Sequence, residues 1–316
     1  MRVLVTGGTG FLGRAVVRAV AEAGHEAIVF ARRASASGLP GQAFDGDIRD
    51  EGALFAASEG CEAVLHGAAL VSTWKARSRD FDDVNVGGLQ AVLRAARRRG
   101  MRRIVYTSSF MALASGGLAQ PPRWNDYQRT KAAGDAIARR EASRGAPLVC
   151  LYPGVVYGPG PATEGNLVGG LIGDHLRGRL PGVVGGDRIW SFAYLDDVAA
   201  AHVAALGAGR PGARYHLGGE NAPPMRAFDI VRALTGRPLP RRIPDWLASP
   251  AALACELRAS WFGCPPRLTT GTLEVLLHDW PLGHAQAADD LGYRVTPLDE
   301  GVARVVRALQ DEGAGA

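Results

Sequence analysis

Thr6-Gly7-Gly8-Thr9-Gly10-Phe11-Leu12-Gly13 is the stretch that decides the fold of this chain. It follows a short β-branched run and opens an amphipathic segment, which predicts a turn between a first strand and a first helix. Gly7 would permit a tight turn, Gly10 would let backbone approach a pyrophosphate, and Gly13 would let the helix pack closely on the strand. The helix N-terminus would offer free N–H groups and the positive end of its dipole to phosphates. This arrangement predicts a dinucleotide-binding site.

The first half of the chain alternates short apolar runs with amphipathic segments. Such alternation predicts the α/β class, a doubly wound parallel sheet (Rossmann fold) with helices on both faces. The expected strands are residues 2–5, 27–30, 63–66, 103–107 and 148–152, and the expected helices are residues 12–23, 52–58, 86–99 and 127–143.

After Pro153 the pattern loosens into segments rich in glycine and proline, which predicts a crossing into a second lobe. Two later segments are expected to return to the sheet, a helix at 198–206 and a strand at 215–217, and two helices are expected in the lobe, at 225–234 and 245–262. We therefore expect a dinucleotide-binding domain of residues 1–155 plus 190–218, and a smaller, discontinuous α/β substrate lobe of residues 156–189 plus 219–316.

Composition excludes several classes of protein. Of the 316 residues, 42 are glycine, 47% are hydrophobic and 21% are charged, which is typical of a globular chain. No run of about 18 uncharged apolar residues is present and no signal-peptide pattern precedes the glycine loop, so we expect no membrane partner. The four cysteines lie far apart without matching histidines, which argues against a metal site and a disulfide framework. We expect a reducing, cytoplasmic location.

The net charge of +5 raises the question of an acidic partner. Its densest source is the arginine cluster between residues 94 and 103, around the end of an expected helix. Cations there interact favourably with the negative end of the helix dipole and remain solvated. No aromatic residues are interleaved for base stacking, so we expect no nucleic-acid partner.

The choice of nicotinamide cofactor depends on the end of the second expected strand, where an acidic side chain would bind the ribose 2′-OH of NAD. This chain reads Phe30-Ala31-Arg32-Arg33 there. Two guanidinium groups suit the 2′-phosphate of NADP, by charge and by bidentate hydrogen bonding. The alternative is that one or both arginines only solvate a strand end. We predict NADP(H), with NAD(H) as the less favoured cofactor.

Tyr127 and Lys131 are four residues apart, which places both side chains on one face of an expected helix. A cation beside a phenol stabilises the phenolate, so we expect the Tyr127 pKa to be lowered toward neutrality and the phenol to act as a proton donor. This pattern is common by chance. Its position favours a catalytic role, because it follows a strand whose end carries Ser108 and Ser109.

These features together resemble the extended short-chain dehydrogenase/reductases, also called the NAD-dependent epimerase/dehydratase superfamily, along nearly the whole chain. The resemblance is closest to the dihydroflavonol-reductase and 3β-hydroxysteroid-dehydrogenase branch. Besides the glycine loop, the matching stretches are Gly46-Asp47, His66-Gly67-Ala68-Ala69, Asn85-Val86, Tyr106-Thr107-Ser108-Ser109, Tyr127-Gln128-Arg129-Thr130-Lys131, Tyr152-Pro153-Gly154, Tyr157-Gly158-Pro159-Gly160 and Asp196-Asp197-Val198-Ala199.

The resemblance implies a catalytic triad of Ser109, Tyr127 and Lys131. Hydride would pass directly between the nicotinamide and a carbonyl or carbinol carbon. In the reducing direction Tyr127 would protonate the incipient alkoxide and Ser109 would hydrogen-bond its oxygen. Lys131 would tune the Tyr127 pKa and hold the nicotinamide ribose.

The resemblance also places further cofactor contacts. Asp47 and Ile48 would face the adenine, Ala68 and Ala69 the ribose and pyrophosphate, and residues 153–156 the nicotinamide. Asn85 would either assist through an ordered water or cap a helix. The expected cofactor-binding residues are Thr6, Gly7, Gly10, Phe11, Leu12, Gly13, Arg32, Arg33, Asp47, Ile48, His66, Ala68, Ala69, Asn85, Tyr127, Lys131, Tyr152, Pro153, Gly154, Val155 and Val156.

Apolar side chains dominate the segments expected to line the substrate pocket: Trp74, Phe110, Met111, Trp124, Tyr157, Leu167 and Trp190. We therefore expect reduction of a ketone or aldehyde, or oxidation of a secondary alcohol, on a bulky and largely apolar substrate. The short segment between Ser109 and Tyr127 suggests a pocket of altered width.

Two alternatives remain. A nucleotide-sugar epimerase or dehydratase with tightly bound NAD would need cationic anchors for a diphosphate, for which Arg177, Arg179 and Arg188 are candidates. A non-catalytic dinucleotide-binding sensor is disfavoured by the intact triad. By resemblance we also expect a homodimer, formed through the helices at 86–99 and 127–143.

Overall fold

The computed structural model describes residues 1–72, 74, 77–114, 117–262, 266 and 268–314. At its centre is a parallel sheet of seven strands in the order β3-β2-β1-β4-β5-β6-β9. The expected α/β fold with a doubly wound parallel sheet is confirmed. The strands are β1 (Arg2–Thr6), β2 (Glu26–Ala31), β3 (Gln42–Asp45), β4 (Ala63–His66), β5 (Arg103–Thr107), β6 (Leu148–Pro153) and β9 (Arg214–Leu217).

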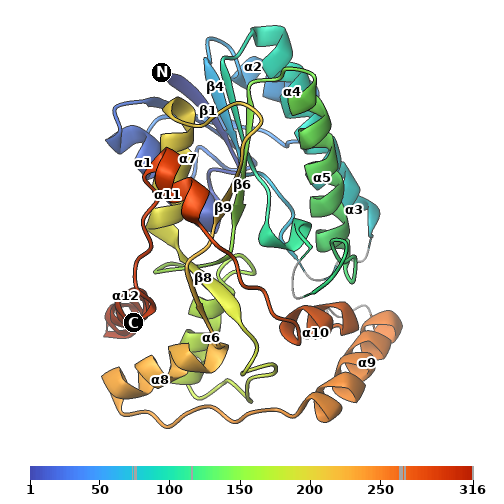
Figure 1. Ribbon diagram of the computed structural model, residues 1–316, viewed down its shortest axis with the longest axis vertical. Helices are drawn as coiled ribbons and strands as arrows, with labels where there is room; N and C mark the ends of the chain where they lie inside the picture. Colours follow the sequence, from blue (N-terminus) through green and yellow to red (C-terminus); the bar gives the residue numbers. More distant parts are fainter. Residues whose placement is uncertain (73, 75–76, 115–116, 263–265, 267, 315–316) are drawn as a thin grey trace.

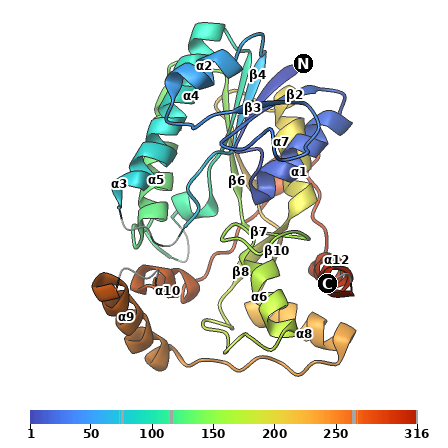
Figure 2. The same ribbon diagram turned by 180° about the vertical axis from the view of Figure 1, so that it is seen from behind.

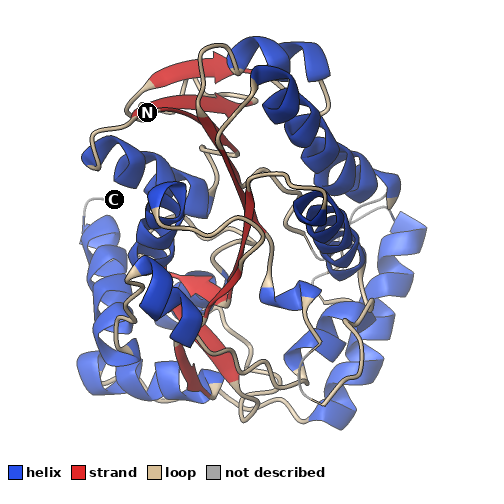
Figure 3. Ribbon diagram, turned by 45° about the horizontal axis from the view of Figure 1, so that its top comes forward, coloured by secondary structure: helices blue, strands red, loops and turns tan. Residues whose placement is uncertain are grey.

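Helices cover both faces of this sheet (Figures 1 and 3). Parallel strands covered in this way are apolar almost throughout, because neither side of the sheet meets water. The four residues of β4, for example, are all buried. One face is covered by α1 (Phe11–Glu22), α7 (Leu195–Gly207) and α11 (Ala285–Leu291), and the other by α2 (Glu51–Ala57), α4 (Gly88–Arg99) and α5 (Asp126–Ser143).

The helix expected at residues 86–99 has a longer, irregular beginning. A short helix α3 (Arg79–Phe81) continues into a π-helical stretch, η1 (Asp82–Gly87), and then into α4. Such i→i+5 stretches are rare in proteins, and those that occur are often found at functional sites. It brings Asn85 to a buried position opposite α5.

A second, three-stranded sheet forms the base of the other lobe (Figure 2), in the order β10-β8-β7. Its strands are β7 (Val155–Tyr157), β8 (Trp190–Tyr194) and β10 (Glu220–Ala222). The accompanying helices are η2 (Phe110–Ala112, a 3₁₀ turn), α6 (Leu167–Leu176), α8 (Pro224–Thr235), α9 (Asp245–Phe262), α10 (Thr270–Leu276) and α12 (Leu298–Ala314).

The expected division of the chain stays a prediction. Helix α7 packs on α1 and β9 closes one edge of the large sheet, whereas β8, within the same expected segment 190–218, pairs with β7 and β10. In the described part of the chain, no helix combines the length and apolar character needed to cross a membrane.

Candidate active site

A cleft of about 830 Å³ lies where the carboxyl ends of the parallel strands meet the second lobe. Ligands of open α/β sheets bind at this edge. The glycine loop and the ends of β2, β4 and β5 line one half. Residues of β7, β8 and α10 line the other. A volume of this size is in the range of small-molecule sites.

Most of the expected site residues lie in this cleft. Those lining it are Gly7, Gly10, Phe11, Leu12, Gly13, Arg32, Asp47, Ile48, Ala68, Ala69, Ser109, Phe110, Met111, Tyr127, Lys131, Pro153, Gly154, Val155, Val156, Leu167 and Trp190. The expected residues that are not among its described lining are Thr6, Arg33, His66, Trp74, Asn85, Trp124, Tyr152 and Tyr157.

The glycine loop has the close approaches that a pyrophosphate cradle needs. Gly7 has a φ of +75°, and a Cβ there would lie 2.7 Å from Ala68 backbone. A Cβ on Gly13 would lie 2.1 Å from the Gly7 carbonyl oxygen, so only glycine lets α1 begin this close to the turn. Gly10, the N-cap of α1, has no side chain to satisfy the first N–H groups of the helix. The loop therefore fits the phosphates of a dinucleotide.

Two arginines and an aspartate line the cleft at the end of β2. Arg49 donates to both Asp47 carboxylate oxygens, at 2.9 and 2.7 Å. This contact, helped by the charge of Arg32, lowers the Asp47 pKa to about 2. Arg33 is exposed and is not among the described lining residues. Sequence reasoning missed Arg49, because only the fold brings the segment after β3 beside the end of β2.

Thr6 and His66 lie beneath the glycine loop. The Thr6 hydroxyl and His66 Nδ1 are 2.7 Å apart, and the imidazole stacks on Tyr106 with ring centroids 5.8 Å apart. Burial lowers the His66 pKa to about 3, so the ring is neutral at physiological pH. Both residues join the ends of β1 and β4 and support the loop from below.

The three expected catalytic side chains meet in the middle of the cleft. Tyr127 and Lys131 lie one turn apart on α5, and the Lys131 ammonium is 5.8 Å from the centroid of the Tyr127 ring. Lys131 Nζ donates to the Thr107 carbonyl oxygen at 3.0 Å, which fixes it at the end of β5. The Ser109 hydroxyl follows the same strand and is hydrogen-bonded to Tyr127.

The expected lowering of the Tyr127 pKa is contradicted. Burial of the phenol raises its pKa to about 12, and the hydrogen bond with Ser109 offsets only part of that rise. Burial also lowers the Lys131 pKa to about 8, so the ammonium is still charged at neutral pH but does not offset the burial of the phenol. Tyr127 is consequently protonated at neutral pH, the form that can donate a proton.

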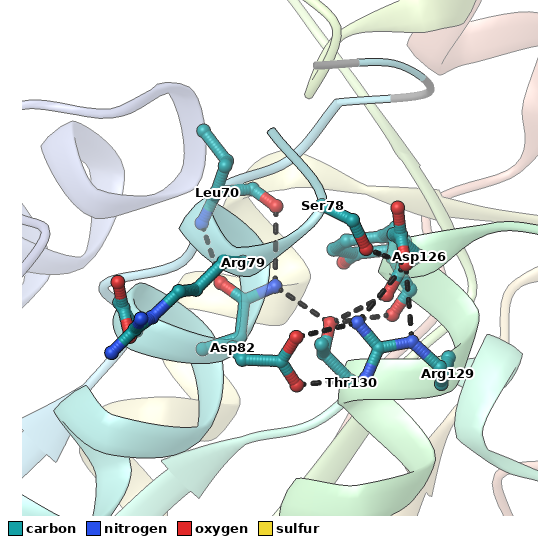
Figure 4. Close-up of polar contacts among 10 residues, drawn as sticks. Leu70, Ser78, Arg79, Asp82, Asp126, Arg129 and Thr130 are labelled. Atoms are coloured by element: carbon teal, nitrogen blue, oxygen red, sulfur yellow. Dashed lines mark hydrogen bonds and ion pairs between the residues drawn. The ribbon is translucent and has the colours of Figure 1, made fainter. Parts of the chain in front are cut away.

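A polar network fixes the first turns of α5 (Figure 4). The Arg129 guanidinium donates to both carboxylate oxygens of Asp82, each at 2.7 Å, and to Asp126 at 3.0 and 3.1 Å. Bidentate pairs of this kind give fixed geometry as well as energy. Because Arg129 lies between Tyr127 and Lys131 in the sequence, the network sets the orientation of the catalytic turn against η1.

Asn85 belongs to the same network and lies inside η1, so it does not cap a helix. Its Oδ1 accepts from the Leu70 N–H at 2.7 Å, and its Nδ2 donates to the Leu70 carbonyl oxygen at 3.3 Å and to the Thr130 hydroxyl at 3.0 Å. It thereby ties the cleft-lining loop after β4 to α5. Its expected cofactor role stays a prediction. Tyr152 is similarly occupied, since its phenol donates to Asp135 and accepts from Arg214.

The substrate half of the cleft is apolar. Phe110 and Trp280 meet edge to face with ring centroids 5.4 Å apart, and Trp124 lies behind them, 6.0 Å from Trp280. Tyr157 is fully buried, and the Trp74 carbonyl oxygen accepts from the Ser72 hydroxyl. The lining residues that the sequence analysis did not expect include Val275, Leu276 and Trp280, and, on the loop before α6, Thr163, Glu164 and Gly165.

The short segment between Ser109 and Tyr127 includes residues 115 and 116, which lie outside the described part of the chain. Its expected effect on the width of the pocket therefore stays a prediction. No group of three or more histidine, cysteine, aspartate or glutamate residues in the described part is arranged to hold a metal ion.

Comparison with known proteins adds to this geometry. A sequence profile of the NAD dependent epimerase/dehydratase family matches residues 3–218. The chain is 36% identical over 267 residues to sterol demethylase protein B of Methylococcus capsulatus, covering 80% of each chain. It is 34% identical over 259 residues to 2-alkyl-3-oxoalkanoate reductase of Stenotrophomonas maltophilia, covering 75% of this chain and 77% of the relative.

The fold is also similar to a solved structure of Thermus thermophilus UDP-glucose 4-epimerase in complex with NAD. The TM-score is 0.77 at 25% identity, over 98% of this chain and 99% of the other. Relatives named dihydroflavonol 4-reductase and 3β-hydroxysteroid dehydrogenase match as well, which confirms the branch suggested by the sequence.

Proposed function

The chain belongs to the NAD-dependent epimerase/dehydratase family of extended short-chain dehydrogenase/reductases, and from that premise we propose that it is an NADP(H)-dependent oxidoreductase of a bulky, largely apolar substrate. It would reduce a ketone or aldehyde, or oxidise the corresponding secondary alcohol. Relatives with oxidoreductase names support the general class, and the finer assignment rests on the cleft.

The observation that carries this proposal is the apolar wall facing the catalytic groups. Beyond Ser109 and Tyr127, the described lining of the substrate half includes Phe110, Met111, Trp190, Val275, Leu276 and Trp280. Such a surface favours apolar rings or chains, because their burial gives about 25 cal/mol for each Å² removed from water.

The same lining argues against a nucleotide-sugar substrate. The lysine and arginine residues of the described lining are Arg32, Arg49 and Lys131. Arg32 and Arg49 lie beside the end of β2, in the nucleotide half, and Lys131 lies in the catalytic turn of α5. The candidate diphosphate anchors Arg177, Arg179 and Arg188 are not among the described lining residues. A diphosphate in the apolar half would therefore lose its hydration without a cationic partner there.

Each catalytic side chain has a defined task in this proposal. Tyr127, protonated at neutral pH, would donate its proton to the oxygen of the reduced carbonyl, and Ser109 would hydrogen-bond that oxygen. Lys131, held by the Thr107 carbonyl, would position the tyrosine and the ribose side of the cofactor. When bound, the nicotinamide supplies or accepts the hydride.

The preference for NADP(H) is supported by Arg32 and Arg49, whose guanidinium groups both act on Asp47 at the adenosine end. A 2′-phosphate between them would find two charge-assisted donors. The Asp47 and Ile48 side chains remain the proposed adenine contacts, beside the Ala68 and Ala69 backbone. A homodimer through α4 and α5 and a cytoplasmic location are further parts of the proposal.

An epimerase that keeps NAD bound is the second candidate, favoured by the similarity to the Thermus thermophilus enzyme. A non-catalytic sensor is disfavoured, because it would not need a tyrosine, a serine and a lysine together in one cleft.

The test is NADPH oxidation by the purified protein with a panel of ketones that includes 2-alkyl-3-oxoalkanoates and 3-oxosteroids. We expect turnover that Tyr127→Phe abolishes while the Kd for NADPH stays nearly unchanged. Tightly bound NAD in the purified protein, with no NADPH turnover on any ketone, would support the epimerase instead. An unaffected rate in the Tyr127 variant would show that another group is the acid.

A further inference from the structure

Helix α9 presents a row of large apolar side chains to solvent. Trp246 and Trp261 are 76% and 77% exposed, and Leu253 between them is 52% exposed. Residues 246, 253 and 261 are separated by seven and eight positions, which places them on one face of an α-helix. Leu247, which is 48% exposed, borders the same face.

The opposite face of α9 is already covered. Ala248 and Ala252 are buried against Leu273 of α10, and Ala259 is buried as well. The helix is thus apolar on both sides, although only its alanine side packs on the protein. A helix with this pattern is expected to bury its outer face against a second apolar surface as well. Figures 1 and 2 show α9 at the outer edge of the second lobe, beside α10.

The charges around this face indicate which surrounding it fits. Between residues 237 and 262 the chain has four arginines and two acidic residues. The two acids are engaged within the lobe, since Asp245 pairs with Arg188 and Glu256 accepts from Thr270. Arg241 and Arg258 are exposed. Exposed tryptophans with arginines at their sides are typical of helices that lie in the headgroup region of an anionic bilayer.

A second copy of the chain fits this face less well. The 18 residues of α9 span about 27 Å, and a helix is about 10 Å wide, so its outer face offers about 270 Å². A stable protein interface needs about 800 Å² from each partner. A lipid surface has no such threshold, because each inserted side chain contributes its own transfer free energy.

We propose that the exposed face of α9 docks the protein peripherally on an anionic lipid surface. The expectation of no membrane partner rested on the absence of a spanning segment, and a helix lying in the interface requires none. The neighbouring α10 contributes Val275 and Leu276 to the apolar half of the cleft. Docking would therefore bring that half close to the lipid phase, where apolar molecules accumulate. The docking itself does not depend on the proposed reaction.

The test is cosedimentation of the full chain with phosphatidylcholine vesicles, with and without phosphatidylglycerol. We expect binding to the anionic vesicles that weakens in high salt. Trp246→Ser with Trp261→Ser should lower the partition coefficient by about tenfold or more, equivalent to about 1.4 kcal/mol. The matched control is Leu234→Ser on α8, a leucine that is 51% exposed and should leave partitioning unchanged.

Thermal unfolding and NADPH affinity of each variant check that the fold is intact. Failure of the unaltered protein to bind anionic vesicles would overturn the proposal, as would equal partitioning of the double tryptophan variant. Gel filtration decides the competing outcome: self-association that the tryptophan substitutions abolish, without vesicle binding, would assign the face to a second copy and also overturn it.

Discussion

Lys131 gives a quantitative test of the site, because it is a cation held almost out of contact with water. Its side chain is 4% exposed, and burial lowers its pKa from 10.5 to about 8. Below pH 8 the group is charged in both the folded and the unfolded chain, and the cost of burying the charge is fully present. Between pH 8 and 10.5 the unfolded chain binds more protons, so the free energy of unfolding rises with pH. At about 1.4 kcal/mol for each pKa unit, the rise is about 3 kcal/mol.

Lys131→Met removes the charge and keeps a chain of similar length. We expect the variant to be more stable relative to the native protein below pH 8 than at pH 10.5, by about 3 kcal/mol. The loss of the hydrogen bond to Thr107 adds an offset, but one that changes little with pH. Urea unfolding at a series of pH values, without added nucleotide, measures the difference directly.

Arg140→Met serves as the control, since it removes a cation from an exposed position on the same helix. Its stability should run parallel to that of the native protein at every pH. If the Lys131 variant also ran parallel, or if its advantage grew as the pH rose, the buried-cation argument would be refuted. A confirmed cost would mean that the fold retains a destabilising charge, as active sites commonly do.

Three further substitutions test other parts of the site. Arg49→Gln should weaken NADPH binding by about tenfold or more with little effect on NADH, whereas Arg33→Gln should change neither Kd; equal losses in both variants would contradict the cofactor assignment. Gly13→Ala should abolish nucleotide binding, because its Cβ would lie 2.1 Å from a carbonyl oxygen, while Gly207→Ala, with open space at its Cβ, should bind normally in the same fluorescence titration. Arg129→Met should lower kcat about tenfold or more with NADPH affinity retained, since it frees the catalytic turn from η1; an unchanged kcat would show that the network is only structural.

The sheet domain could be predicted because its signals are local. The strand expected at residues 63–66 has the same bounds as β4, since a short buried run between polar turns allows little else. The edge strand β3 was missed because its four residues are half-exposed or exposed and carry no apolar pattern. The strands β7, β8 and β10 were missed for another reason: they pair across long sequence separations inside the second lobe.

The nucleotide half of the cleft was also largely predictable, because close backbone approaches require glycine at fixed spacings. Two errors there share one cause. Arg49 was overlooked and the direction of the Tyr127 pKa was wrong because both depend on which groups the fold brings together and how deeply it buries them. The four-residue spacing in the sequence gives the pairing of Tyr127 with Lys131, but not the burial of the phenol, which outweighs the effect of the lysine charge.

The substrate half differs in kind, because its wall is assembled from distant segments. Phe110 follows β5, whereas Trp280, which meets it edge to face, follows α10 much later in the chain. No local pattern marks Val275 or Leu276 as lining residues, since each occupies an ordinary apolar position of α10. The same lobe also leaves the tryptophans of α9 exposed. From helical periodicity alone, such an apolar face would be expected to pack on the core. Substrate choice and surface docking therefore arise from the same long-range packing of the second lobe, and both must be tested by substitutions there rather than by changes around the cofactor.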